Sequence, residues 1–130
     1  MRRWLIPALA VAGLVAVAPP AAPQPAPELR VIDGDTIAYR GQTIRIRGLD
    51  APEMHGQCES EIRRAHQARD RLAELLAGGL RIYPHGRDRY RRVLAVVRDA
   101  RGRDVARVLI TEGLARPYNG RGQRQGWCHG

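Results

Sequence analysis

The sequence predicts a small α+β domain that is mainly β, in which five short strands form a closed barrel and two helices accompany it. Three observations support this fold class. Short runs of β-branched and apolar residues alternate with glycines, two longer runs have helical spacing, and residues 28–130 suffice for one modest core. Closure of the barrel removes the strand edges that a small β domain otherwise leaves exposed.

Three strands are expected in residues 28–50. The segments 28–34, "ELRVIDG", and 35–41, "DTIAYRG", are short apolar runs punctuated by glycine, which is typical of a strand pair. In residues 42–50, "QTIRIRGLD", Ile44 and Ile46 alternate with Arg45 and Arg47. One face of this strand is therefore expected in the core, and the other is available for function.

Two helices and two further strands follow. Residues 59–77 predict an amphipathic helix that ends at Gly78 and Gly79, with apolar residues at spacings of three and four: Ile62, Ala65, Ala68, Leu72, Leu75 and Leu76. Strands are expected at 80–86 and from residue 92, the latter ending in the turn "DARG". A second helix is expected over 104–115, with Asp104 as its N-cap and Val105, Val108 and Leu109 facing inward. This order of elements suits a barrel of the OB type.

The N-terminal residues have the layout of an export signal. Residues 1–18 combine two arginines with a 15-residue apolar run, which is shorter than the ~20 residues that span a bilayer. The small residues at 16–18 fit a cleavage site, but Pro19 disfavours cleavage, so an uncleaved membrane tether remains the alternative. Residues 19–27 read as a proline- and alanine-rich spacer, which leaves residues 28–130 as the folding unit. A secreted or periplasmic location is expected.

The charge and the cysteines indicate a polyanionic partner and an oxidising compartment. Residues 28–130 contain 20 arginines and 13 acidic residues, a net charge of +7, and the chain contains no lysine. Such an excess favours nucleic acid, although a composition bias toward arginine is the alternative. Cys58 and Cys128 are the two cysteines of an exported chain, so a disulfide is expected. Zinc bound by these cysteines with His55 and His129 is a weaker alternative.

Carboxylates lie near the ends of neighbouring predicted strands. Asp35 begins the second strand and Asp50 ends the third, so strand pairing can bring both to one end of the barrel. Two carboxylates brought together either share a proton or bind a cation, and an oxygen-only site suits Ca²⁺ or Mg²⁺. A plain Asx turn at Asp33-Gly34-Asp35 is the alternative. His66 and His85 are expected to be solvated rather than catalytic.

Four segments carry a resemblance to a known family. The segments "IDGDT", "IRIRGLDAPE", "DRYRRVLA" and "LITEGLARPY" resemble those of the staphylococcal nuclease (thermonuclease) family in order and approximate spacing, over about residues 31–118. The resemblance implies an OB barrel that cleaves DNA and RNA with Ca²⁺. It also implies metal ligands at Asp35, Asp50 and the Ala51 carbonyl, a general base or water-positioning group at Glu53, and phosphate-binding arginines at Arg45 and Arg92. Asp33 would lie just outside the metal ligands, and Arg89, Tyr90 and Tyr118 would contact the nucleotide.

The chemistry of phosphodiester cleavage gives these residue types a reason. Attack on the phosphorus builds negative charge, which a divalent ion and two arginines neutralise, and a nearby carboxylate activates the attacking water.

One position departs from the family pattern, since Arg91 replaces a glycine and could displace Arg92 if the backbone there needs positive φ. The chain is also shorter than the founding member.

The expected function is an exported, Ca²⁺-dependent nuclease of low sequence specificity, with Mg²⁺ as an alternative ion. It is expected to act as a monomer on DNA or RNA, without a stable protein partner. The first alternative is a non-catalytic nucleic-acid-binding barrel. The second is an interaction module that uses neither metal nor phosphate.

Overall fold

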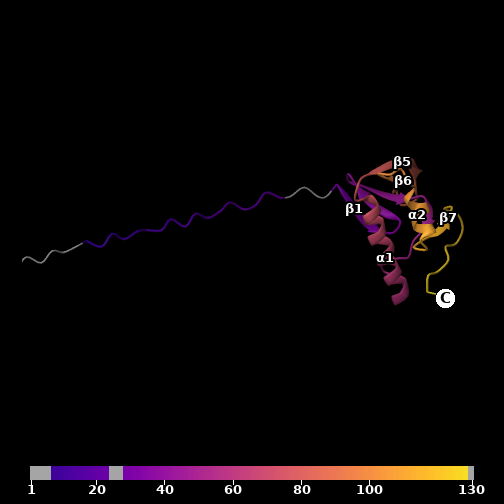
Figure 1. The fold of residues 1–130 in the computed structure, drawn as a ribbon, viewed down its shortest axis with the longest axis horizontal. Helices are drawn as coiled ribbons and strands as arrows, with labels where there is room; N and C mark the ends of the chain where they lie inside the picture. Colours follow the sequence, from indigo (N-terminus) through magenta and orange to yellow (C-terminus); the bar gives the residue numbers. More distant parts are fainter. Residues whose placement is uncertain (1–6, 24–27, 129–130) are drawn as a thin grey trace, which may run out of the picture.

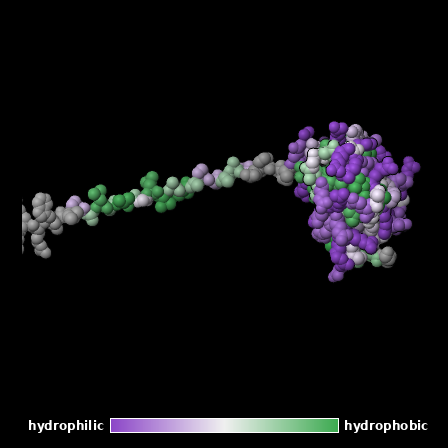
Figure 2. Space-filling view, in the orientation of Figure 1, coloured by the Kyte–Doolittle hydropathy of each residue, from purple (hydrophilic) through white to green (hydrophobic). Residues whose placement is uncertain are grey.

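A computed structural model of the protein describes residues 7–23 and 28–128. Residues 7–23 contain no helix or strand, and their apolar side chains are exposed (Figures 1 and 2). Residues 1–6 of the predicted signal and 24–27 of the predicted spacer lie outside the described residues, as does His129 of the zinc alternative. Among the helices of the described residues, none has the length and apolar character needed to cross a membrane.

The domain is built on a five-stranded mixed sheet. Its order is β1-β2-β3-β6-β5, in which β3 and β6 are parallel and the other neighbours are antiparallel. The strands are β1 (Leu29–Asp33), β2 (Thr36–Tyr39), β3 (Gln42–Ile46), β5 (Leu80–Arg87) and β6 (Val93–Asp99). The mainly β fold with two helices, expected from the sequence, is thus confirmed.

The sheet is not closed, contrary to the expected closed barrel. The segment predicted as one strand over 42–50 is divided, because Gly48 adopts a φ of +92° and turns the chain out of the main sheet. Its second part, β4 (Gly48–Asp50), pairs antiparallel with β7 (Arg116–Tyr118), a strand that periodicity did not predict. The main sheet therefore keeps two edges. Pro84 and exposed arginines on β5 disfavour pairing of that edge with another chain.

Two helices cover the apolar face and complete the core (Figure 1). Helix α1 (Glu59–Leu76) packs against β1 and α2, and α2 (Val105–Thr111) packs against β4 and β6. Asp104 caps α2 as predicted, since its side chain accepts a hydrogen bond from the Ala106 N–H. The fully buried side chains come from both layers: Ile37, Ile46, Leu49, Leu72, Leu76, Val97, Val105 and Leu109. The predicted inner faces are confirmed except that Ile62 and Val108 are only half-buried.

Two turns at the ends of β6 have the same construction. In residues 88–92, Asp88 accepts hydrogen bonds from the Tyr90 and Arg92 N–H groups through Oδ1 and from Arg92 Nε through Oδ2. In residues 99–103, Asp99 makes the matching bonds to Arg101 and Arg103. The fourth residue has positive φ in both turns. The aspartate and the arginine four residues later thus form a recurring local unit.

Candidate functional site

Asp33, Asp35, Asp50 and Glu53 form an acidic cluster between the turn before β2 and the end of β4. Asp35 Oδ2 accepts the Ala51 N–H at 3.1 Å and lies 3.3 Å from Arg45 Nη2, while Asp35 Oδ1 accepts the Thr36 hydroxyl at 2.9 Å. The Asp35 carboxylate is therefore held against the peptide that follows Asp50. The expected approach of these two acidic segments is present, although Asp35 lies in the turn before β2 of the main sheet and Asp50 lies in β4 of the two-stranded sheet.

Asp33 forms the Asx turn that the sequence left as an alternative. Its Oδ1 accepts the Asp35 N–H at 3.0 Å, which orients the second aspartate. Burial, followed by the negative charge of Asp35, raises the pKa of Asp33 to about 7. Gly34 permits this approach, because a Cβ there would lie 2.7 Å from the Ala68 Cβ and 2.8 Å from the Ala51 Cβ. The turn is thus packed closely against Ala51 and against Ala68 of α1.

Asp50 and Glu53 share one positively charged partner. Arg124 Nη1 lies 3.0 Å from Asp50 Oδ1 and 3.2 Å from Glu53 Oε1, and the Trp127 indole N–H donates to Asp50 Oδ2 at 3.3 Å. Asp50 is buried and Glu53 is exposed, so one carboxylate lies within the protein and the other faces solvent. Although burial opposes it, the charges of Asp50 and Glu53 raise the pKa of Arg124.

The donor set of this cluster fits a hard divalent cation. Asp35 is joined to the segment of Asp50 through the Ala51 N–H, and Asp50 is joined to Glu53 through Arg124, so the three carboxylates belong to one contact network. Burial is the main cause of the raised pKa of Asp33, and the negative charge of Asp35 adds to it. Oxygen-only ligands suit Ca²⁺ or Mg²⁺. Ala51, whose carbonyl was predicted as a ligand, contacts Asp35 through its N–H.

Arg45 is buried beside the acids. Its Nη1 donates to the Ile46 carbonyl at 2.7 Å and its Nη2 to the Leu49 carbonyl at 3.0 Å, in addition to the contact with Asp35. Only 11% of its side chain is exposed. The guanidinium is therefore fixed in orientation at the boundary between the acidic cluster and the neighbouring groove, which it also lines.

Arg92 also lines that groove and belongs to the turn 88–92. Its Nε is held by Asp88 Oδ2 at 2.7 Å, and this bond does not use the two Nη groups. Burial would raise the pKa of Asp88, but the hydrogen bonds from Arg92 outweigh it and hold that pKa below its ordinary value. The Tyr90 ring contacts two cations, with the guanidinium carbons of Arg89 and Arg92 at 4.9 Å and 5.4 Å from its centroid.

The groove is large, and its lining carries six arginines and two aspartates. Its volume is about 1160 Å³, and its lining includes predicted and unpredicted residues: Arg45, Arg47, His85, Arg89, Tyr90, Arg92, Tyr118, Asn119, Arg121 and Arg124. Tyr118 reaches it from β7 and donates its hydroxyl proton to the Gly122 carbonyl at 2.9 Å. His85 and His66 are exposed, as expected. A strand of nucleic acid in this groove would meet several arginines and two tyrosines.

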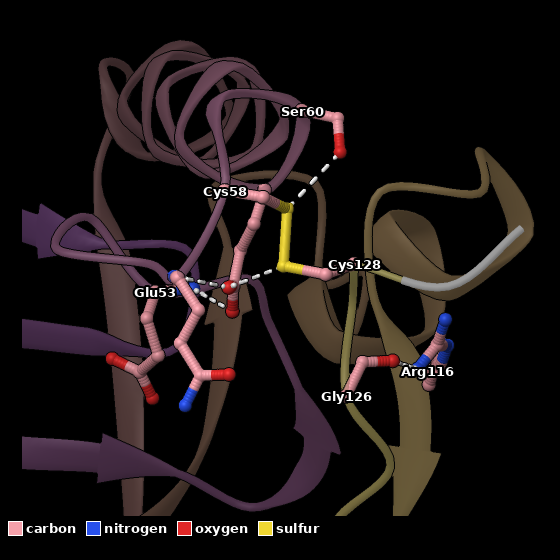
Figure 3. The surroundings of a disulfide bond; sticks show 8 residues. Glu53, Cys58, Ser60, Arg116, Gly126 and Cys128 are labelled. Carbon is pink, nitrogen blue, oxygen red and sulfur yellow. Dashed lines mark hydrogen bonds between the residues drawn. A yellow bond between two sulfur atoms is a disulfide. The ribbon is translucent and has the colours of Figure 1, made fainter.

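A disulfide links the C-terminal segment to the start of α1, next to the loop that carries Glu53. Cys58 and Cys128 are bonded, with their Cα atoms 5.9 Å apart (Figure 3). Arg116 lies over the Trp127 ring at 3.7 Å and donates to the Gly126 carbonyl at 2.8 Å. The predicted disulfide is present. Since both sulfur atoms are used in the bond, the cluster Cys58, Glu61 and Cys128 is not a zinc site in this state.

Glu61 organises the loop that carries Glu53. This buried carboxylate on α1 accepts the Glu53 N–H at 3.4 Å and the Gln57 N–H at 2.9 Å, and Cys128 Sγ lies 3.5 Å away (Figure 3). A Cβ on Gly56 would lie 2.6 Å from that carboxylate, so the loop wraps closely around it. The loop that presents Glu53 is therefore built around one buried acid.

Three residues of the site were missed from the sequence: Glu61, Arg124 and Trp127. Glu61 resembles the other charged residues of α1, and nothing in the helical spacing separates it from them. For Arg124 and Trp127 the available signal was the pairing of Cys58 with Cys128. That pairing brings the residues just before Cys128 to the start of α1, and hence to the acids.

Comparison with known proteins identifies related sequences. The family model described as staphylococcal nuclease homologue matches residues 43–126, well over half of the chain. The succinoglycan biosynthesis protein ExoI of Rhizobium meliloti (strain 1021) is 36% identical over 91 residues, which are 65% of this chain and 48% of that protein. The chain thus spans about half the length of this curated relative.

Proposed function

Because this chain belongs to the family of staphylococcal nuclease homologues, we propose that it is a metal-dependent nuclease that hydrolyses DNA or RNA phosphodiester bonds with low sequence specificity. The observation that carries the proposal is the position of the acidic cluster beside the basic groove. Arg45 and Arg124 each contact an acid of the cluster and also line the groove. A scissile phosphate held by the groove would thus lie next to carboxylates.

In this proposal Asp35 and Asp50 hold the divalent cation, with the Ala51 carbonyl as a further ligand. Bound there, Ca²⁺ or Mg²⁺ would polarise a phosphoryl oxygen and neutralise charge. The oxygen-only donor set supports Ca²⁺ or Mg²⁺ over a softer metal. The family generally uses Ca²⁺, so Ca²⁺ is the ion we propose.

Glu53 is the proposed general base or water-positioning group. Its carboxylate is half exposed, at 50% of the side chain, so water can reach it, and its backbone N–H is held by Glu61. Glu53 Oε1 contacts Arg124, and the exposed part of the side chain leaves the carboxylate open to a water that it can orient or deprotonate. Glu53 therefore has the accessibility that this task requires.

Arg45 and Arg92 are the proposed phosphate-binding pair. Arg45 is buried and fixed beside Asp35, which suits stabilisation of charge that develops next to the metal ligands. Arg92 is held at Nε by Asp88, so its two Nη groups can bind two phosphate oxygens. Arg89, Tyr90 and Tyr118 would contact the neighbouring nucleotide. Because all these groups recognise phosphate or stack on any base, sequence specificity is expected to be low.

We also propose that the protein works as a monomer outside the cytoplasm, secreted or periplasmic. The Cys58–Cys128 disulfide supports an oxidising compartment. The arrangement of residues 1–18 supports export, either with cleavage or as a tether. No stable protein partner is proposed.

The test is cleavage of single-stranded DNA and RNA by the purified chain with Ca²⁺, with Mg²⁺ and with chelator, beside Glu53→Gln. We expect cleavage that needs the cation and falls by about a hundredfold or more in Glu53→Gln, the size of a general-base contribution. The matched control is Glu59→Gln. Glu59 is the first residue of α1, next to Cys58, and its side chain is 95% exposed, so this variant should retain activity. Binding without cleavage under every cation would favour the non-catalytic barrel instead.

A further inference from the structure

Arg124 contacts Asp50, a proposed metal ligand, and Glu53, the proposed general base. Its Nη1 lies within 3.2 Å of an oxygen from each carboxylate. A guanidinium and a divalent cation at the same Asp50 oxygen are mutually exclusive by space and by charge. Arg124 and the metal would therefore compete for Asp50, and release of Arg124 would also free Glu53.

The segment that carries Arg124 is fixed on both sides of it. Before it, the Gly122 carbonyl accepts the Tyr118 hydroxyl at 2.9 Å. After it, the Trp127 indole N–H bonds to Asp50, and Cys128 is linked to Cys58. The backbone is thus anchored, whereas the Arg124 side chain is 48% exposed and can change its partner without moving these anchors.

The alternative partner of Arg124 is a phosphate in the groove. Arg124 lines the same groove as Arg45, Arg89 and Arg92, so its guanidinium lies among the groups that bind the nucleic acid backbone. A guanidinium binds phosphate oxygens as it binds carboxylate oxygens, through two parallel N–H donors. When a phosphate enters, Arg124 has a new acceptor on the groove side of the acids.

From these contacts we propose that Arg124 couples metal binding to phosphate binding, by pairing with Asp50 and Glu53 when neither ligand is bound and with phosphate when both are. The inference rests on the nuclease function proposed above. Metal entry releases Arg124 toward the groove, and phosphate entry draws it away from the acids. Each ligand therefore raises the affinity for the other, by the same factor in both directions.

The coupling is measured by fluorescence of Trp127, whose indole bonds to Asp50. The full chain carries Trp4→Phe, so that Trp127 is the sole tryptophan. Ca²⁺ is titrated with and without thymidine monophosphate, which offers a phosphate and no diester to hydrolyse. In the otherwise unchanged chain, the nucleotide should tighten Ca²⁺ binding, and Ca²⁺ should tighten nucleotide binding equally.

Arg124→Gln should move the two affinities in opposite directions. Without nucleotide, Ca²⁺ should bind roughly fivefold more tightly, since a competing ion pair of about 1 kcal/mol is removed. Thymidine monophosphate should bind more weakly in the presence of Ca²⁺, and the coupling factor should approach one. Arg124→Lys, which keeps the charge and loses the planar fork, should keep the competition with Ca²⁺ and lose part of the phosphate affinity.

Arg107→Gln is the matched control. Arg107 is exposed on α2 and is not among the residues that line the groove. The change removes one arginine charge, as Arg124→Gln does, and it should leave Ca²⁺ affinity and coupling within about a factor of two, the size of a screened surface charge effect.

The outcomes separate this inference from the function on which it rests. If Ca²⁺ binds both proteins with the same affinity and the same coupling, Arg124 is no coupling residue while the nuclease proposal stands. Weaker Ca²⁺ binding in Arg124→Gln would show that Arg124 supports the metal site structurally, and would also overturn the inference. If Ca²⁺ binds to neither protein, both proposals fail.

Discussion

Arg91 and Gly102 occupy the same position in two turns of the same construction. Each is the fourth residue of a turn that begins at an aspartate and ends at an arginine bound to that aspartate through Nε. Their φ angles are +67° and +80°, both in the left-handed region that favours glycine. The second turn therefore shows the residue that suits this backbone, and the first turn carries an arginine instead. The positive φ on which the sequence made strain at Arg91 conditional is thus present.

Arg91→Gly should stabilise the domain by about 1 kcal/mol, because glycine adopts positive φ without the steric cost that arginine has there. The free energy of unfolding in urea is the measurement. Gly102→Ala should have the opposite effect at the matching position. Equal stability of Arg91→Gly and the parent chain would mean that contacts of the arginine side chain offset the strain. Because Arg92 is already held by Asp88, nuclease activity should not rise by more than about twofold.

Glu61→Ala should lower both stability and activity. It removes the acceptor of the Glu53 and Gln57 N–H groups, and leaving such groups unpaired costs about 1 to 3 kcal/mol. Because the loop that presents Glu53 loses its anchor, kcat should fall by a larger factor than the affinity for substrate does. Thermal unfolding and steady-state kinetics measure the two effects.

Glu61→Gln distinguishes positioning from general loss of structure. It keeps one acceptor oxygen, so it should recover most of the stability and part of kcat. Full activity in Glu61→Ala, at a temperature where the variant is folded, would show that Glu53 does not depend on this anchor.

Asp99 should make the protein sensitive to acid. Burial would raise its pKa, but the hydrogen bonds from Arg103 and Arg101 outweigh burial and lower it below the ordinary value. A carboxyl group with a lowered pKa in the folded state contributes stability that is present above its unfolded pKa of about 3.9 and is lost as the pH falls through the folded pKa. Asp99→Asn should therefore reduce the slope of stability against pH below about pH 4. The same slope in both proteins would contradict this role, and Asp70→Asn, at an exposed position, is the control.

Loss of the disulfide should destabilise the domain and release Trp127. The double variant Cys58→Ala and Cys128→Ala opens a loop with a sequence separation of 70, which corresponds to about 4 kcal/mol in the unfolded-chain model. In a chain with Trp4→Phe, the emission of Trp127 should shift to longer wavelength as the indole leaves Asp50. An unchanged emission maximum would mean that Arg116 and Asp50 hold the tryptophan without the covalent bond.

Most of the fold was predictable because local patterns decide it. The spacing of Ala65, Ala68, Leu72 and Leu76 predicts the buried face of α1, and Asp104 predicts the start of α2. Closure of the sheet was not predictable in this way. It depends on the backbone at Gly48 and on the pairing of β4 with β7, and these are long-range relations with no period in the sequence.

The residues of the candidate site likewise fall into those that local motifs predict and those that only long-range contacts reveal. Asp35, Asp50 and Glu53 lie in motifs that can be read locally, and the structure brings the segments that carry them together. Arg124 acts on Asp50 across 74 positions of sequence, in a segment whose composition is that of a basic tail. Only the folded chain relates the two. The phosphate contacts of Arg89, Tyr90 and Tyr118 stay predictions, although all three line the groove.

The Cys58–Cys128 bond also changes what a protease can do to this molecule. Every peptide bond between the two cysteines lies inside a covalent ring, so a single nick there opens the ring without separating fragments. That ring contains Arg92, Tyr118 and Arg124, and the hydrogen bonds of the sheet would still hold the nicked ends close to their original positions. In a protease-rich extracellular fluid, a nicked copy would remain one molecule and would separate into two pieces only after reduction.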